Sequence, residues 1–436
     1  MLIEDAAMNQ VVEIDVPRAT PLPTAAAESV GFAADRLARM DKAMQKVIDA
    51  GHYAGIGVMV ARHGKLVKSA SYGFQTLEGG EPLREDAIFR IASMTKPIIA
   101  VAMMSLYEEG QWQLDDPVTK FIPEFADLQV MTKEGALTPL DRPMLMRHVM
   151  SSSAGFAFGP AVGSTNLQVD QLYANAGLWS GTADDMIERL AKLPLEAQPG
   201  TEFRYGLQQE VQGAIIRRLS GQGLDRFLQS RVFEPLLMKD TGFGVPEDQR
   251  DRIVPRYTVD KNLKLVLSPD QSAFPTLAGT PAGVTPKMLL SIAGLYSTAQ
   301  DYLRFAQMLA NKGALDGVRV LSPSSVALMT SNLLAEGVPM HFDQSFDGVG
   351  YGMNLGIVLD PAHADFNGGG VGAGTFFWGG VHGTWFWVDP VNDIVVVGMV
   401  QQVDAGNAMT GRPYPVTDIR GVSRSITYGA LIDADK

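Results

Sequence analysis

A serine and a lysine three residues apart are the chain's clearest candidates for chemistry. Ser93 and Lys96 stand in the run Ser-Met-Thr-Lys, just before an apolar segment at 97–106. Residues at this spacing lie on one face of a helix, one turn apart. A serine hydroxyl attacks poorly until a neighbour takes its proton, and a lysine amine can take it or hold a second base in its anionic form. The pair predicts acyl transfer through an acyl-enzyme. The alternative is a serine cap on a buried helix with a solvated lysine.

The surrounding sequence places Ser93 at the start of a helix. A strand-like segment at 87–92 leads into the motif, and the helix is expected to end near 108–110. Pro97 limits where that helix can begin, because proline fits best in a first turn whose N–H groups lack partners. Ser93 is therefore expected at the helix N-terminus, where the positive end of the dipole favours negative charge.

Tyr205 is the best candidate for a second base. It follows the Pro199-Gly200 turn and precedes a helical segment at 208–220, so a loop facing a cleft is expected. A free phenol titrates near ~10, and a nearby ammonium would lower that pKa and favour the phenolate. Tyr205 and Lys96 would then titrate as a coupled pair, and either could be the kinetic base. The alternative is a buried structural tyrosine.

A glycine-rich late strand is the candidate for binding the oxyanion. Trp378, Gly379 and Gly380 belong to the run at 377–383, and glycines let a strand backbone approach a substrate closely. A backbone N–H from this run, together with that of Ser93, would form an oxyanion hole. Trp378 could instead be an ordinary core residue.

Composition narrows the class of protein. The chain has 436 residues, 46% of them hydrophobic, no cysteine and a net charge of −12. This charge argues against nucleic acid and anionic membranes as partners, and the lack of cysteine excludes thiol catalysis and disulfides. The N-terminus lacks a Sec-type signal, and no apolar run approaches ~18 residues. We expect a cytoplasmic enzyme without metal or cofactor; the oligomeric state is left open.

Hydrophobic periodicity predicts an α+β fold with an antiparallel sheet flanked by helices. Strands near both ends must pair with each other and enclose a mostly helical lobe. The predicted units are an arm at 1–28, an α/β lobe at 29–110 plus 285–436, and a helical lobe at 111–284. The predicted helices are 32–50, 184–192, 208–220 and 422–432, and the predicted strands are 55–62, 66–72, 351–358, 375–388 and 393–401.

Three motifs in this order resemble those of the family VIII carboxylesterases, relatives of class C β-lactamases and DD-peptidases. They are Ser-Met-Thr-Lys at 93–96, the tyrosine at 205, and Trp-Gly-Gly at 378–380, and the resemblance covers roughly 30–434. It implies a β-lactamase/transpeptidase-like fold. It also implies Ser93 as nucleophile, Lys96 and Tyr205 as base system, and Trp378-Gly379-Gly380 in place of a lysine-threonine-glycine strand.

Two departures favour an ester over a β-lactam as the small-molecule substrate. Leu207 stands where lactamases of this type carry asparagine, and Trp378 stands where they carry lysine. Losing an amide and a cation removes polar recognition of an anionic substrate, whereas tryptophan suits an apolar group. The hypothesis is a carboxylesterase for short-chain esters. The alternatives are a β-lactamase or DD-peptidase, an acyltransferase to an alcohol, and a non-catalytic ligand-binding relative.

Other motifs favour structural roles. No Gly-x-Ser-x-Gly elbow or His-Glu-x-x-His zinc pattern occurs. Asp115 and Asp116 are expected to cap a helix rather than act as an acid/base pair. His148 is expected to be structural, and His382 to be a loop residue rather than a substrate contact. The glycines at 368–374 are expected to form a flexible loop at the cleft rather than a phosphate site.

Overall fold

Seven antiparallel strands form one sheet that joins the two ends of the chain. The computed structural model describes residues 21–159, 166–262, 264–268, 281–284, 286–342, 346–364, 370–403 and 418–432. The strand order is β11-β12-β13-β14-β15-β1-β2, and β1 pairs with β15 across more than 300 residues of sequence. Its strands are β1 (Gly55–Arg62), β2 (Lys65–Gly73), β11 (Val349–Tyr351), β12 (Gly356–Val358), β13 (Phe376–Gly379), β14 (Trp385–Asp389) and β15 (Ile394–Met399).

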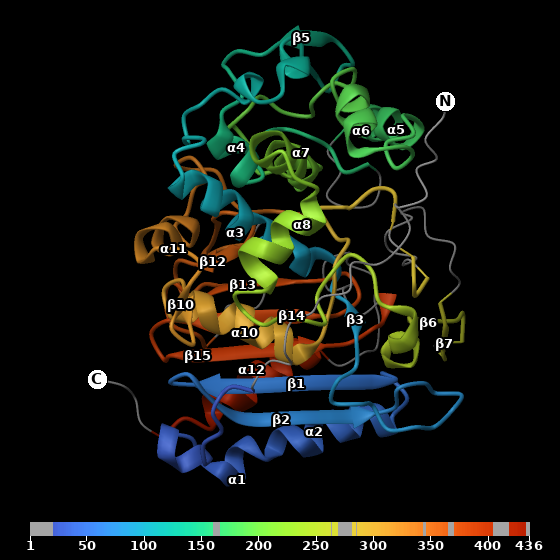
Figure 1. Ribbon diagram of the computed structural model, residues 1–436, viewed down its shortest axis with the longest axis vertical. Coiled ribbons are helices and arrows are strands. Elements are labelled where there is room, and N and C mark those ends of the chain that lie inside the picture. Colours follow the sequence, from blue (N-terminus) through green and yellow to red (C-terminus); the bar gives the residue numbers. More distant parts are fainter. Residues whose placement is uncertain are drawn as a thin grey trace, which may run out of the picture.

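Helices cover this sheet and build a separate lobe beyond it (Figure 1). Every residue of β1 and β15 is buried, so both faces of the sheet are covered there. The helices are α1 (Ala34–Leu37), α2 (Arg39–Asp49), α3 (Thr95–Glu108), α4 (Met146–Met150), α5 (Leu167–Asn175), α6 (Ala183–Leu190), α7 (Gln208–Ser220), α8 (Leu224–Leu228), α10 (Ala299–Ala310), α11 (Pro323–Met329) and α12 (Ile419–Gly429). Helix α10 packs on β1, β14 and β15, while α2 packs on β2 and α12 on α2.

Short two-stranded pairs lie outside the main sheet. They are β3 (Phe89–Arg90) with β8 (Tyr296–Ser297), β4 (Gln129–Met131) with β5 (Leu137–Pro139), β6 (Tyr257–Val259) with β7 (Leu265–Leu267), and β9 (Ala314–Leu315) with β10 (Val318–Arg319). The β3–β8 pair matters most for function, because β3 leads directly into Ser93.

The predicted α+β architecture is confirmed, including the pairing of strands from both ends around a helical insertion. The hairpin at 55–73 is also confirmed, as are the helices expected at 184–192, observed as α6, and at 208–220, observed as α7. The helix expected at 32–50 is split into α1 and α2, whose apolar residues at helical spacing are buried: Leu37, Met40, Met44, Val47 and Ile48. Residues 1–20 of the expected arm lie outside the described residues, and Leu22 is buried.

Two predicted strands are each two strands. The segment at 351–358 turns at Asn354, whose φ of 61° lies in the left-handed region, so β11 and β12 form a hairpin. Asparagine tolerates this conformation better than most residues because its short polar side chain bonds locally. The segment at 375–388 turns at 380–384 to give the β13–β14 hairpin. Alternation of apolar residues marked the strands but not the turns within them.

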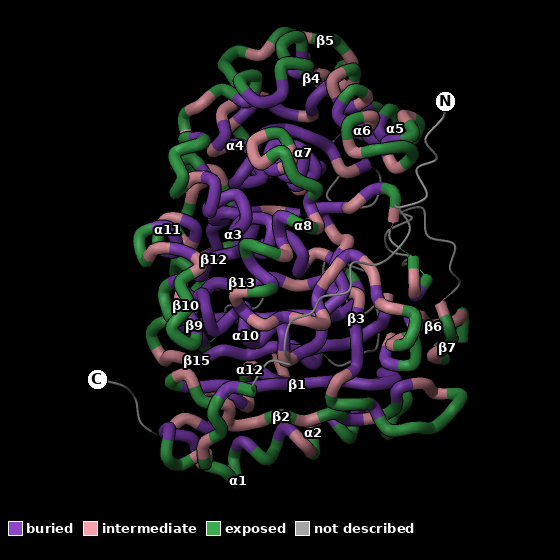
Figure 2. Tube along the Cα trace, in the orientation of Figure 1, coloured by how far each residue is buried: buried purple, intermediate pink, exposed green. Residues whose placement is uncertain are grey.

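The centre of the molecule, where α3 passes between the sheet and the helical lobe, is almost entirely buried (Figure 2). Twelve residues of α3, from Thr95 to Leu106, are buried. Such a helix, apolar all round, stays in place because neighbours pack on every side. Across the described part of the chain, no helix combines the length and apolar character needed to cross a bilayer.

Candidate active site

Ser93 lies in a strained turn between β3 and α3. The residue before it, Ala92, has a φ of 47°, a conformation that costs a non-glycine residue roughly 1–2 kcal/mol. Ile91 anchors this turn, because its N–H donates to the Leu295 carbonyl at 3.0 Å and its carbonyl accepts from Met94 N–H at 3.0 Å. Ser93 itself belongs to a short 3-10 helix, Ala92–Met94, that opens directly into α3. The turn presents the Ser93 hydroxyl at a helix N-terminus with partial exposure.

The structure brings Ser93, Lys96 and Tyr205 together. Lys96 Nζ lies 2.8 Å from Ser93 Oγ, and the Tyr205 hydroxyl lies 2.9 Å from the same oxygen. Lys96 Nζ also lies 4.7 Å from the centre of the Tyr205 ring. Tyr205 stands on the loop just before α7, as expected from the Pro-Gly turn upstream. Lys96 and Tyr205, from two distant segments, therefore converge on the Ser93 hydroxyl.

Burial shifts the pKa values of both Lys96 and Tyr205. Lys96 is fully buried, and desolvation lowers the pKa of its ammonium well below the usual range, while Glu210 partly opposes that shift. Desolvation likewise raises the pKa of Tyr205, with a smaller opposing effect from its hydrogen bond to Ser93. Both shifts favour the uncharged form. The direction for Tyr205 is opposite to the one expected from a neighbouring ammonium, because burial dominates the shift and also favours the uncharged amine of Lys96.

A buried amide network holds α3 in register with α7. The Asn354 side chain donates to the Lys96 carbonyl at 3.0 Å and to Gln212 Oε1 at 2.6 Å, and it accepts from Gln209 and Gln212. Lys96 Nζ donates in addition to the Ile292 carbonyl at 2.8 Å. These partners were not among the residues predicted from the sequence. In the sequence, Asn354 is marked only as a polar residue that lies between two short apolar segments.

Aromatic side chains surround the Tyr205 ring and form one wall of the site. Ring centres lie 5.1 Å away for Phe342, 5.7 Å for Trp378 and 6.0 Å for Phe158. Tyr351 lies 5.2 Å from Trp378 and extends the wall. Trp378 is thus buried against Tyr205. The wall beside Ser93 is therefore apolar.

The end of β13 lies against the turn that carries Ser93. A Cβ placed on Gly380 would lie 2.6 Å from the Ile91 carbonyl oxygen and 3.3 Å from Ala92 Cβ, so only glycine fits. Gly380 N–H, however, donates to the Thr384 carbonyl at 2.8 Å within the turn. It is therefore not available to bind an oxyanion. Within the described residues, no backbone acceptor is recorded for the next N–H, that of Val381.

Gly379 is the last residue of β13 in the β13–β14 hairpin. It pairs with Trp385 across the hairpin. The fully buried Arg420 of α12 donates to the carbonyls of Gly380 and Thr384 at 3.1 and 3.3 Å, which fixes the same turn from behind. The C-terminal helix thereby supports the backbone beside Ser93.

The other polar motifs lie in structural settings. Asp115 pairs with Arg147, and Asp116 accepts from Gln113 N–H and Lys120 Nζ. His148 lies in α4, where its Nδ1 accepts from Leu145 N–H.

His382 is a buried loop residue beside the Arg90 carbonyl, and burial lowers its pKa to about 3. Of the glycine run, 370–374 forms a turn in which Gly372 N–H donates to Asp389, and 368–369 lies outside the described residues.

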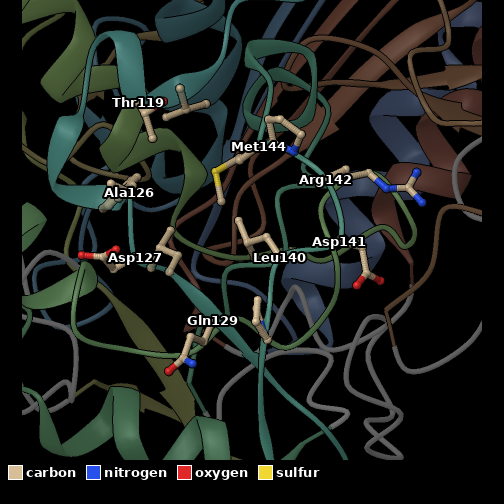
Figure 3. A pocket seen from close by; sticks show the side chains of 13 residues that line it. Thr119, Ala126, Asp127, Gln129, Leu140, Asp141, Arg142 and Met144 are labelled. Carbon is tan, nitrogen blue, oxygen red and sulfur yellow. The ribbon is translucent and has the colours of Figure 1, made fainter.

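A separate groove of about 740 Å³ lies in the helical lobe beside β4 and β5 (Figure 3). Met144 and Leu140 stand near the middle of its lining, with the charged side chains of Asp127, Asp141 and Arg142 around them. Ser93 and its two partners do not line it. This groove is therefore distinct from the Ser93 chemistry.

Comparisons with known proteins agree with this fold. The beta-lactamase family model matches residues 40–417. Rv1367c of Mycobacterium tuberculosis H37Rv is 35% identical over 387 residues, 85% of this chain and 92% of that protein. Esterase EstB of Burkholderia gladioli is 31% identical over 368 residues, 82% of this chain and 88% of EstB.

A solved structure points the same way. EstCE1, described as a hydrolase with promiscuous acyltransferase activity, has 26% identity and a TM-score of 0.70, and the match covers 89% of this chain and 99% of EstCE1. The expected kinship and the β-lactamase/transpeptidase-like fold are confirmed. The chain belongs to the beta-lactamase family and is a serine hydrolase of that family.

Proposed function

We propose that this protein is a carboxylesterase for short-chain esters that works through an acyl-enzyme on Ser93. One observation carries the proposal: Ser93 Oγ lies within 2.8 Å of Lys96 Nζ and 2.9 Å of the Tyr205 hydroxyl. A hydroxyl in contact with a buried amine has a proton acceptor in place, which is what nucleophilic catalysis by serine requires.

In the proposed acylation, the free amine of Lys96 takes the Ser93 proton as Oγ attacks the ester carbonyl. The lowered pKa of Lys96 supports this role, because a base must be unprotonated near neutral pH. The raised pKa of Tyr205 supports a neutral phenol that donates to Oγ, gives its proton to the leaving alcohol and takes one back from the Lys96 ammonium, so that both groups return to their starting forms. Water then releases the acid by the same route in reverse.

The oxyanion is proposed to bind two backbone N–H groups. Ser93 N–H belongs to the first turn of a helix, where donors lack intrahelical partners. Val381 N–H follows Gly380 on the strand end that lies against Ala92. Val381 lies within the run at 377–383 from which a donor was expected, whereas Gly380 N–H is already bonded to Thr384. Two such donors stabilise the charge that develops in the transition state.

The lining of the site favours an ester over a β-lactam. Leu207 is fully buried, and the Trp378 ring packs against Tyr205, so neither position offers an amide or a cation to a substrate carboxylate. An apolar wall suits an uncharged acyl or alkoxy group. Esterase EstB, a relative at 31% identity, is consistent with this substrate class.

The test compares two substrates on the purified protein. We expect steady turnover of p-nitrophenyl butyrate and at least about a hundredfold lower kcat/KM for a chromogenic cephalosporin, a difference of ~2.7 kcal/mol in transition-state binding. Preferred turnover of the cephalosporin would instead place the protein among the lactam hydrolases.

Transfer of the acyl group to an alcohol is a second candidate activity. The observation that favours it is the match to EstCE1, which is described as having acyltransferase activity. The aromatic wall beside Tyr205 could hold an alcohol in place of water. Addition of a short alcohol to the ester assay tests this: new ester in the products supports transfer, and free acid alone excludes it.

A further inference from the structure

Glu210 is a buried carboxylate linked to Lys96 through a single residue. Glu210 lies in the first turn of α7, and its Oε1 accepts from Ile292 N–H at 2.9 Å. The carbonyl of the same Ile292 accepts from Lys96 Nζ at 2.8 Å. The exposed fractions of Glu210, Lys96 and Ile292 are 4%, 0% and 2%. One peptide segment therefore joins an acid and a base that water does not reach.

A negative charge on Glu210 becomes most important when Lys96 takes a proton and turns positive. An isolated buried charge is costly, and an opposite charge nearby offsets that cost. Burial raises the pKa of Glu210 to about 7, and Lys96 opposes the rise. The groups facing Lys96 Nζ are Glu210 of α7, Tyr205 from the loop before α7, and Ser93 from its own turn. Glu210 supplies the negative charge among them.

We propose that Glu210 is a positioning residue for the Ser93 reaction. Its carboxylate fixes the Ile292 backbone that Lys96 binds, and it stabilises the positive charge that Lys96 acquires on taking the Ser93 proton. In that step the Ser93 O–H bond breaks and a Lys96 N–H bond forms, so the amine becomes an ammonium while Glu210 stays ionised. This inference rests on the proposed function.

Removing the negative charge of Glu210 is expected to move the acid limb of the pH–rate profile to lower pH. Acylation needs the free amine, so the acid limb of the rate profile reports protonation of Lys96 together with that of Glu210. Glu210→Gln removes the negative charge and keeps the amide oxygen that can accept from Ile292 N–H. The pKa of Lys96 then falls further, because the group that favours its charged form is gone. The acid limb moves to lower pH.

The experiment uses Glu210→Gln with Asp301→Asn as its matched control. Asp301 is also a buried acid whose pKa is raised to about 7, but it bonds to Thr241 and Asp240 and not to the trio. The readout is the pH dependence of Ser93 labelling by a fluorophosphonate, followed by mass spectrometry, together with kcat and KM for p-nitrophenyl butyrate. Circular dichroism establishes that each variant is folded.

For Glu210→Gln we expect the maximal rate of Ser93 labelling and kcat to fall about tenfold or more, while KM stays within about twofold. We also expect the acid limb of the pH profile to move to lower pH by about one unit or more. Asp301→Asn should keep the wild-type profile. An unmoved acid limb in a folded Glu210→Gln would overturn the inference, whatever its rate, because a purely structural role changes the rate without moving the limb.

A second variant, Glu210→Asp, tests the inference if Glu210→Gln does not fold. If Glu210→Gln does not fold, Glu210→Asp retains the charge, and its acid limb should stay within about half a pH unit of wild type even where the rate falls. A limb displaced by a full unit would contradict the inference. Labelling needs no ester substrate, so a protein that labels at Ser93 with the predicted pH shift yet ignores esters would disprove the proposed substrate and not the role of Glu210.

Discussion

Replacing Tyr205 by phenylalanine isolates the contribution of one hydroxyl. That hydroxyl donates to Ser93 Oγ at 2.9 Å, while the ring packs on Phe342, Trp378 and Phe158. Phenylalanine keeps the ring and its aromatic contacts. The variant therefore removes the proposed proton route to the leaving alcohol and leaves the apolar wall in place.

Tyr205→Phe is expected to reduce activity strongly but stability only slightly. A positioned group that transfers a proton in the transition state contributes about 10²–10⁴-fold, or ~3–5 kcal/mol of barrier. Losing one intramolecular hydrogen bond changes the free energy of unfolding by only ~0.5–1.5 kcal/mol. We therefore expect kcat for p-nitrophenyl butyrate to fall at least about a hundredfold, with KM within about threefold and a small change in Tm.

The assay needs a control that loses a similar hydroxyl nearby. Tyr302 is fully buried, and its hydroxyl donates to the Met94 carbonyl at 2.9 Å, next to Ser93 in sequence but without contact to Oγ. Tyr302→Phe should lower the free energy of unfolding by ~0.5–1.5 kcal/mol and change kcat less than about fivefold. The reasoning fails if Tyr205→Phe retains kcat within tenfold of wild type, or if both variants lose activity equally.

Two further variants test the turn beside Ser93 and the buried histidine of α4. Gly380→Ala places a Cβ 2.6 Å from the Ile91 carbonyl, so the strand end must shift and kcat/KM should fall at least about tenfold; unchanged esterase kinetics would contradict this. His148 has its pKa lowered to about 4 by burial, below its unfolded value near ~6.5, so the unfolded chain binds the extra proton and stability falls as pH drops from ~6.5 to 4. Urea titrations over that pH range should show that the free energy of unfolding of His148→Gln falls by up to about 3 kcal/mol less than that of wild type. Equal losses in the two proteins would contradict a histidine that is held neutral by burial.

Local sequence patterns predicted the parts of the site that lie on one helix or one loop. Ser93 and Lys96 are one helical turn apart, so their spacing alone brings them together, and the Pro-Gly turn placed Tyr205 on a loop. The pairing of β1 with β15 followed from strands at both chain ends.

Long-range partners could not be predicted in this way. Ile292 and Asn354 meet Lys96 from positions 196 and 258 residues away, a separation that no helical or strand period encodes. The sequence could not show which N–H of the run at 377–383 is already bonded within the turn, because the bond from Gly380 to Thr384 depends on the hairpin geometry. The direction of the Tyr205 pKa shift depends on burial, which a charge argument from the sequence does not include.

The central claim is that Ser93 carries the acyl group. The most direct measurement is mass spectrometry of the protein quenched during turnover of p-nitrophenyl butyrate, with the adduct located by peptide mapping and Ser93→Ala run alongside. We predict a butyryl group on the peptide containing Ser93, and neither adduct nor turnover above background in Ser93→Ala. A butyryl group on another residue, or turnover that survives in Ser93→Ala, would contradict the account.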